Sequence, residues 1–298
     1  MPSAESSINW QKMGRYGLYG FVTVYLMFCV VMYSIQRTML YEPDRISSSE
    51  FNSLLERDFG AAATVLPEFG AVVVQPKAGQ AVQGTAIFYH GSDHSLFQNA
   101  PVARQFLDRG YRLVLAEYPG FGARAGEPTE HALVTDSDQL YATVAGMFPH
   151  DPITVIGESL GTGVAVQVSA LASERGQAPA ALVLITPFTS VVDVAENTWW
   201  MLPTRWLMKD RFESKRWLDR YQGPVAVVVA ESDEVVGADQ GFAMYQKAMQ
   251  RGKASVLTLQ NALHDDWVKR LSWGDWSTLL AVGRDQPAPL GGPQLAAI

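Results

Sequence analysis

Cysteine is almost absent from this chain, since Cys29 is the only one among 298 residues. A disulfide framework and a thiolate metal cluster are therefore both excluded within one chain. Basic residues are also few: 23 lysines and arginines stand against 30 acids, which gives a net charge of −7. A nucleic-acid-binding protein needs a basic face to displace counterions, so we expect no nucleic-acid partner. The sequence contains neither a G-x-x-x-x-G-K phosphate loop nor an H-E-x-x-H zinc motif, and we expect no cofactor and no metal.

Apolar residues are plentiful, at 48% of the chain, whereas charged residues make up 18%. A chain of this length and composition has room for one large α/β domain. From residue 71 onward, short apolar runs rich in β-branched residues alternate with helix-like stretches. This alternation predicts an α/β fold with a mostly parallel sheet and helices on both faces. The predicted strands are 71–74, 85–89, 111–116, 153–156, 181–185, 225–229 and 255–259, and the predicted helices include 99–109 and 130–148.

Charge is missing altogether from residues 16–36, YGLYGFVTVYLMFCVVMYSIQ. About 20 such residues suffice to cross a bilayer core as a helix, and Tyr16, Tyr19 and Tyr33 suit the two interfaces. A cleaved signal peptide is one alternative, but it would be shorter and followed by small residues, which residues 34–40 lack. A buried core helix is the other alternative. We predict a retained single-pass membrane anchor.

The anchor predicts how the rest of the chain is organised. We expect a polar N-terminal segment at 1–15, the transmembrane anchor at 16–36 and a linker at 37–57. A catalytic domain then covers 58–283, and a disordered tail covers 284–298. Lysines and arginines near the two ends of the span are nearly balanced, but a short polar N-terminus before a large domain is typical of a signal anchor. We therefore predict that the catalytic domain lies on the extracytoplasmic side, periplasmic or lumenal.

The motif Gly157-Glu158-Ser159-Leu160-Gly161 stands between a predicted strand and a helix-like run. In that setting G-x-S-x-G is typical of a sharp turn that exposes a nucleophilic serine, with glycines where side chains would collide with the strand and helix. The first amides of the helix would point to where an oxyanion forms. We predict Ser159 as a nucleophile. A nucleotide-binding loop at 161–163 is a weaker alternative, because Val166 stands where a third glycine is needed.

A serine hydroxyl becomes a good nucleophile when a base takes its proton and an acid orients that base. With this motif the acid and then the base follow the serine along the chain. His264 is the only one of five histidines beyond Ser159, and it follows the last predicted strand. Asp233 follows the strand at 225–229 and is the predicted acid, with Glu231 and Glu234 as nearby alternatives.

The loop His90-Gly91-Ser92-Asp93-His94 follows the strand at 85–89. Its glycine lets the backbone approach a substrate closely. We therefore predict that the backbone N–H groups of Ser92 and Leu160 form an oxyanion hole. His90 precedes the nucleophile and is expected to be structural.

Residues 188–218 interrupt the alternation of strands and helices and include Trp199, Trp200 and Trp206. Two interpretations stay open. The segment is either a helical insertion that buries its aromatic residues on the domain, or a cap over the Ser159 cleft that supplies an apolar acyl or alcohol pocket.

Taken together, these motifs resemble the α/β-hydrolase superfamily, and within it the membrane-anchored serine hydrolases called Bem46-like. The resemblance covers nearly the whole chain. It is carried by the anchor with residues 36–41, the loops at 90–91 and 117–122, the G-x-S-x-G motif, residues 187–190 with 209–212, the Asp233 loop and His264.

The resemblance implies an α/β-hydrolase fold and a Ser-His-Asp triad that cleaves carboxylic esters or thioesters through an acyl-enzyme intermediate. It implies a small-molecule ester or lipid-like substrate, with residues 16–36 in the membrane. Such relatives also include peptidases, so a serine peptidase on the same triad stays an alternative, as does a non-catalytic hydrolase-like binding protein.

Overall fold

A computed structural model describes residues 10–282, so residues 1–9 and the predicted tail at 284–298 lie outside the described residues. Its centre is an eight-stranded sheet in the order β1-β2-β4-β3-β5-β6-β7-β8. Strands β1 and β2, and β2 and β4, pair antiparallel, and every other neighbouring pair is parallel. The strands are β1 Ala63–Leu66, β2 Ala71–Val74, β3 Gly84–Tyr89, β4 Tyr111–Leu115, β5 Ile153–Glu158, β6 Ala181–Ile185, β7 Val225–Ala230 and β8 Ala254–Leu259.

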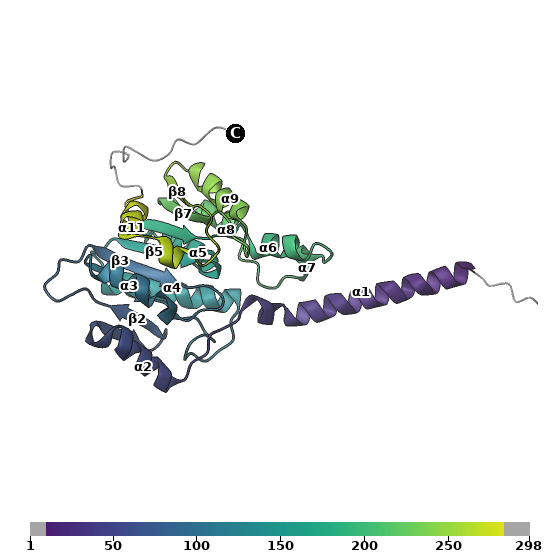
Figure 1. The fold of residues 1–298 in the computed structure, drawn as a ribbon, viewed down its shortest axis with the longest axis horizontal. Helices are drawn as coiled ribbons and strands as arrows, with labels where there is room; N and C mark the ends of the chain where they lie inside the picture. The colour runs from purple at the N-terminus through teal and green to yellow at the C-terminus, as the bar shows by residue number, and fades with distance from the viewer. Residues whose placement is uncertain (1–9, 283–298) are drawn as a thin grey trace, which may run out of the picture.

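Helices cover both faces of this sheet (Figure 1). Alternate residues of β3 point to opposite sides, because successive strand side chains face opposite ways. Ile87 belongs to one buried cluster, with residues of α4, α5 and α9, and Phe88 belongs to another, with residues of α2, α3 and α11. The predicted mostly parallel sheet between two helical layers is confirmed. The helices of these layers are α2 Ser48–Asp58, α3 Ala100–Leu107, α4 Glu130–Met147, α5 Leu160–Glu174, α9 Ala238–Met249, α10 Trp267–Arg270 and α11 Trp273–Leu280.

Two elements at the start of the domain differ from the prediction. Helix α2 lies in the stretch predicted to be a linker; its N-terminus is capped by the Ser47 hydroxyl, and Phe51 packs on the ring of Phe97 at 5.2 Å. Strand β1 was not predicted at all. Its four residues are largely half-exposed, so they lack the continuous apolar run that marks the buried strands. The remaining domain boundaries stay predictions.

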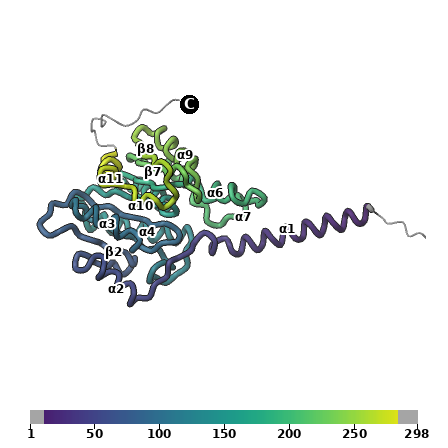
Figure 2. Tube along the Cα trace, viewed as in Figure 1, coloured from purple at the N-terminus to yellow at the C-terminus, as the bar shows by residue number. Residues whose placement is uncertain are grey.

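Helix α1, Trp10–Leu40, projects from the domain as one long rod (Figures 1 and 2). Within the described residues it is the one helix long and apolar enough to cross a membrane, over Gln11–Leu40. Only 6% of its most apolar window is buried inside the structure, so most of its apolar side chains have no protein around them.

The C-terminal end of α1 is fastened to the segment 188–218. The Gln36 amide donates to the Leu207 carbonyl (3.0 Å) and accepts from the Lys209 N–H (2.7 Å). The Arg37 guanidinium donates to the buried carboxylate of Asp210 (2.7 Å). These contacts join two of the segments that carry the family resemblance, 36–41 and 209–212. The segment itself carries α6 Val191–Thr198, α7 Thr204–Leu207 and α8 Ser214–Trp217, and α6 and α7 lie beside α1 (Figure 1).

Candidate active site

The turn between β5 and α5 places Ser159 at the carboxyl end of the sheet. Ser159 has φ 49° and ψ −120°, a conformation that non-glycine residues rarely adopt and that costs about 1–3 kcal/mol. Hydrogen bonds on both sides hold this backbone in place. The Ser159 N–H donates to the Ile185 carbonyl (3.0 Å), and its carbonyl accepts from the Thr162 N–H (2.9 Å). The strained turn is thus fixed by the parallel neighbour strand and by the first turn of the helix.

Two glycines around this turn have no room for a side chain. A Cβ atom at Gly157 would overlap the carbonyl of Gly161, and one at Gly161 would overlap the carbonyl of Tyr89. Both obstacles are backbone atoms, which cannot move aside as a flexible side chain can. The spacing of the motif therefore reflects the close approach of α5 to β5 and β3.

Three side chains from separate loops meet in one hydrogen-bonded line. The Nδ1–H of His264 donates to Asp233 Oδ2 at 2.8 Å, and the hydroxyl of Ser159 donates to His264 Nε2 at 2.8 Å. The other carboxylate oxygen of Asp233 accepts from the N–H groups of Val235 (3.0 Å) and Val236 (2.8 Å). The acid is thus held by its own loop on one side, and it fixes the histidine tautomer on the other.

The pKa of Asp233 and the pKa of His264 are shifted in opposite directions. Burial alone would raise the pKa of Asp233, but hydrogen bonds from His264 and the two backbone amides outweigh it, so this pKa is lowered. Burial alone would lower the pKa of His264, but the hydrogen bond and charge of Asp233 outweigh it and raise this pKa above its ordinary value. Asp233 is therefore a carboxylate at neutral pH.

The two glutamates named as alternatives to Asp233 contact the backbone of the histidine loop instead of the imidazole ring. Glu231 accepts from the N–H of Asn261 (2.8 Å), and Glu234 accepts from the N–H of His264 (3.2 Å). Both carboxylates therefore support the position of the loop, while only Asp233 reaches the ring nitrogen.

The loop after β3 lies against Ser159. A Cβ atom added to Gly91 would lie 3.7 Å from the Cβ of Ser159, so any group larger than glycine would narrow the space above the hydroxyl. His90, expected to be structural, is fully buried and bonded to Glu117 (2.8 Å) and to the carbonyl of Gly91 (2.8 Å). The Ser92 carbonyl accepts from the N–H of Glu42, which joins this loop to the chain just after α1.

A second ionisable pair beside Ser159 was not predicted. Glu158 is 1% exposed, and its carboxylate lies 3.5 Å from His94 Nδ1 and accepts from the indole N–H of Trp267 at 3.3 Å. The interaction with Glu158 outweighs partial burial and raises the pKa of His94 to about 9. One sequence signal could have indicated this pair. Glu158 is a charged residue inside the G-x-S-x-G motif, and a buried carboxylate needs a counterion or hydrogen bonds.

The arrangement can activate a hydroxyl without a metal ligand set. In this geometry a neutral imidazole nitrogen can accept a proton from Ser159, and Asp233 can stabilise the imidazolium that would form. Over residues 10–282, no cluster of three or more His, Cys, Asp or Glu side chains is placed to bind a metal ion. The chemistry that these side chains can perform is nucleophilic attack on an electrophilic carbon.

A family model described as serine aminopeptidase, S33, matches residues 80–218. An uncharacterised protein of Mycobacterium tuberculosis is 32% identical over 192 residues, which are 60% of this chain and 66% of that protein. The lysophosphatidylserine lipase ABHD12 of Danio rerio is 31% identical over 154 residues, which are 47% of this chain and 40% of the lipase. The matched region is thus less than two thirds of either relative.

Solved structures show the same fold. An esterase of Pyrococcus furiosus superposes with a TM-score of 0.60, covering 81% of this chain and 98% of the esterase at 15% sequence identity. At such low identity the superposition compares the arrangement of strands and helices, independently of the substrate.

Proposed function

From the membership of this chain in the α/β-hydrolase superfamily, as an esterase- or lipase-like member, we propose that it is a membrane-anchored serine hydrolase of carboxylic esters or thioesters. Ser159 is the nucleophile, His264 the general base and acid, and Asp233 the residue that orients His264. The observation that carries this proposal is the line of two 2.8 Å hydrogen bonds from Ser159 through His264 to Asp233. That line is what proton transfer from the serine requires.

The reaction proceeds in two steps. Ser159 Oγ attacks the ester carbonyl while His264 Nε2 takes its proton, and the imidazolium then protonates the departing alcohol or thiol. Water next attacks the acyl-enzyme, losing a proton to His264, and the acid leaves as Ser159 recovers its hydrogen. Both steps pass through an oxyanion.

The backbone N–H groups of Ser92 and Leu160 bind this oxyanion. Leu160 is the first residue of α5, where helix geometry leaves the N–H groups without intrahelical acceptors. Ser92 follows Gly91, whose backbone lies close to Ser159. Two donors from different loops converging above one nucleophile are worth several kcal/mol of transition-state stabilisation, at about 3 kcal/mol for each donor.

Residues 16–36 of α1 anchor the enzyme in a membrane. The hydroxyls of Thr23 and Ser34 are satisfied within the helix, as hydrocarbon demands: Thr23 donates to the Tyr19 carbonyl and Ser34 to the Val30 carbonyl, each at 2.8 Å. The extracytoplasmic position of the catalytic domain stays a prediction. Protease added to spheroplasts, which no longer have an intact outer membrane, checks it, since only a domain outside the cytoplasmic membrane is then digested.

A fluorophosphonate probe tests the catalytic proposal directly. The purified full chain should be labelled at Ser159, while Ser159→Ala should lose both labelling and hydrolysis of p-nitrophenyl butyrate. Ser169→Ala removes another buried serine of α5, whose hydroxyl has no hydrogen-bond partner among the described residues, so it serves as the matched control and should keep its labelling. Labelling that persists in Ser159→Ala contradicts the assignment.

A peptidase is the second candidate, because the matching family model carries that description. The same triad would serve, and only the pocket and leaving group would differ. Turnover of aminoacyl-arylamides without turnover of p-nitrophenyl esters would favour the peptidase.

A further inference from the structure

Within residues 188–218, which we call the cap, the loop after α6 and the short helix α7 carry large apolar side chains that are not covered by protein. Trp206 is 88% exposed, Trp200 79% and Met201 58%. We define this cap loop as residues 199–206. Single exposed apolar residues are ordinary on a soluble surface, but three large ones within seven residues, two of them tryptophans, mark a candidate interaction site.

The cap loop is fixed at a definite height along α1. The hydroxyl of Tyr25 donates to the Met201 carbonyl at 2.8 Å, and the Gln36 amide donates to the Leu207 carbonyl at 3.0 Å. The loop therefore runs alongside α1 between the levels of Tyr25 and Gln36. The first bond also pairs a phenol and a carbonyl that would otherwise be unsatisfied in hydrocarbon.

The length of the apolar stretch of α1 determines how deep the cap loop would lie in a bilayer. A hydrocarbon core of about 30 Å needs about 20 helical residues, and Tyr16 to Ile35 is the stretch of that length bounded by Arg15 and Arg37. Tyr25 then lies about 15 Å inside the boundary at Ile35. Raising the bilayer surface to Tyr25 would draw Arg15, which lies about 15 Å further along the helix, deep into the hydrocarbon.

We propose that the cap loop is embedded in the leaflet nearest the catalytic domain, beside α1. We also propose that the groove between α1 and the cap, which extends along α1 from Met32 across the boundary at Ile35 to Leu40, takes up one acyl chain of a leaflet lipid. This inference rests on the proposed membrane span of α1. It makes the cap a second membrane contact, which fixes the orientation of the catalytic domain on the bilayer.

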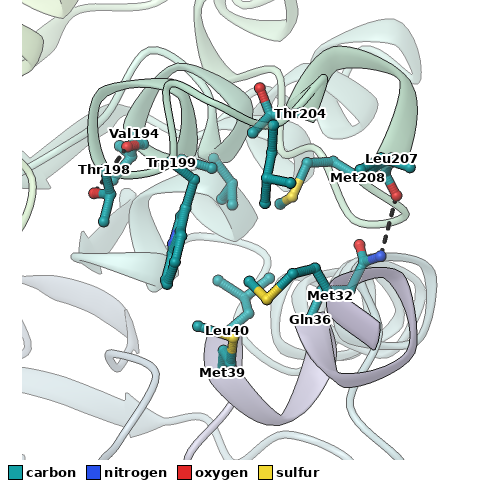
Figure 3. Close-up of a pocket in the computed structure, with 13 residues that line it drawn as sticks. Met32, Gln36, Met39, Leu40, Val194, Thr198, Trp199, Thr204, Leu207 and Met208 are labelled. Atoms are coloured by element: carbon teal, nitrogen blue, oxygen red, sulfur yellow. Dashed lines mark hydrogen bonds between the residues drawn. The ribbon is translucent and has the colours of Figure 1, made fainter. Parts of the chain in front are cut away.

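The groove has the chemistry of an acyl-chain site. Its cavity volume is about 200 Å³, and Figure 3 shows Met32, Met39 and Leu40 of α1 facing Trp199 and Met208 of the cap. Methionine side chains adapt to flexible chains because they are unbranched and polarisable. Neither Ser159 nor His264 lines this groove, so it is a site apart from the catalytic hydrogen bonds.

The single cation within the cap loop does not oppose insertion. Arg205 is paired with Glu196, with Nε 2.7 Å from the carboxylate. A neutralised pair near the level of Gln36 can stay at the lipid headgroups, because long arginine side chains reach toward the interface.

Depth-dependent quenching tests the insertion. In a Cys29→Ala background, which has no other cysteine, an environment-sensitive fluorophore is attached at Trp200→Cys, at Leu26→Cys of α1 and at Val82→Cys. Val82 is exposed and precedes β3, at the end of the sheet opposite Ser159. The full chain is reconstituted with lipids that carry a nitroxide deep in one acyl chain. We expect the labels at 200 and 26 to be quenched similarly and the label at 82 to stay bright.

Activity supplies an independent readout. Trp200→Glu/Trp206→Glu should reduce hydrolysis of a vesicle-borne long-chain ester at least about tenfold, because charge is expelled from hydrocarbon, and should change soluble p-nitrophenyl butyrate turnover less than about twofold. Val82→Glu is the matched control and should change neither. Equal losses on both esters contradict the proposal.

The quenching results distinguish the embedded cap loop from the membrane anchor on which it rests. A quenched label at 26 with an unquenched label at 200 overturns the embedded cap loop and leaves the anchor standing. Unquenched labels at both positions overturn the anchor and the cap loop together. Neither result depends on fluorophosphonate labelling of Ser159, which tests the catalytic proposal separately.

Discussion

Replacing Asp233 with asparagine should disable the proposed base by reversing its tautomer. One oxygen of Asp233 accepts two backbone N–H groups, from Val235 and Val236, so the asparagine carbonyl must take that place. The amide NH₂ then faces His264 Nδ1 and donates to it. An imidazole that accepts at Nδ1 carries its proton on Nε2, which can no longer accept the hydrogen of Ser159.

We expect kcat to fall about 10⁴-fold, equivalent to about 5.5 kcal/mol of lost transition-state stabilisation. The fold should persist, because the substitution keeps the side-chain shape and both backbone hydrogen bonds. Initial rates on p-nitrophenyl butyrate measure the loss, and circular dichroism on heating checks the fold.

Glu234→Gln is the matched control. Its side chain accepts from the backbone N–H of His264, which an amide oxygen can equally do, so we expect a loss below about tenfold. A small loss in Asp233→Asn together with a large loss in Glu234→Gln would refute the assignment of the acid.

Three further predictions concern the pKa of His264, the packing around Gly161 and the ion pair between Arg37 of α1 and Asp210. The pKa of His264 is raised, so His264 stays protonated up to a higher pH and cannot act as a base there. We therefore expect kcat/KM to fall as the pH is lowered, with a midpoint above pH 6.5, and a midpoint below that value contradicts the prediction. Gly161→Ala would force a methyl group into a backbone carbonyl of β3 and should cost more than about 3 kcal/mol of stability, whereas Gly146→Ala in open space on α4 should gain up to about 1 kcal/mol, both read from thermal melts. Arg37→Met should cost about 2 kcal/mol because the buried Asp210 loses its cation; the double variant with Asp210→Asn should recover part of this, and no recovery would contradict the pairing.

The candidate site was largely predictable because its signals are local. A nucleophile elbow needs glycines at fixed positions, and the order of acid and base along the chain left His264 as the one downstream histidine. The structure brings Ser159, His264 and Asp233 within hydrogen-bond distance, while the catalytic roles of these residues, the oxyanion donors Ser92 and Leu160, and the Bem46-like assignment stay predictions for experiment.

The contacts that were missed depend on partners far away in the chain. Phe51 of α2 is buried because Phe97 lies opposite it, and nothing in the sequence near residue 51 indicates that partner. Likewise the pKa of His94 is raised only because the fold places this side chain beside the buried Glu158.

By itself the sequence determined the alternation of strands and helices, the apolar span and the identity of the elbow, because hydrophobic periodicity and glycine sterics act over a few residues. Tertiary structure alone decided that Asp233, not its glutamate neighbours, reaches the imidazole, since one loop turn chooses between them. It also decided that the cap lies against α1, through a bond between Tyr25 and Met201 that joins positions 176 residues apart. Contacts between residues so far apart in the chain depend on how helices and sheet pack together, and sequence patterns over a few residues do not encode that packing.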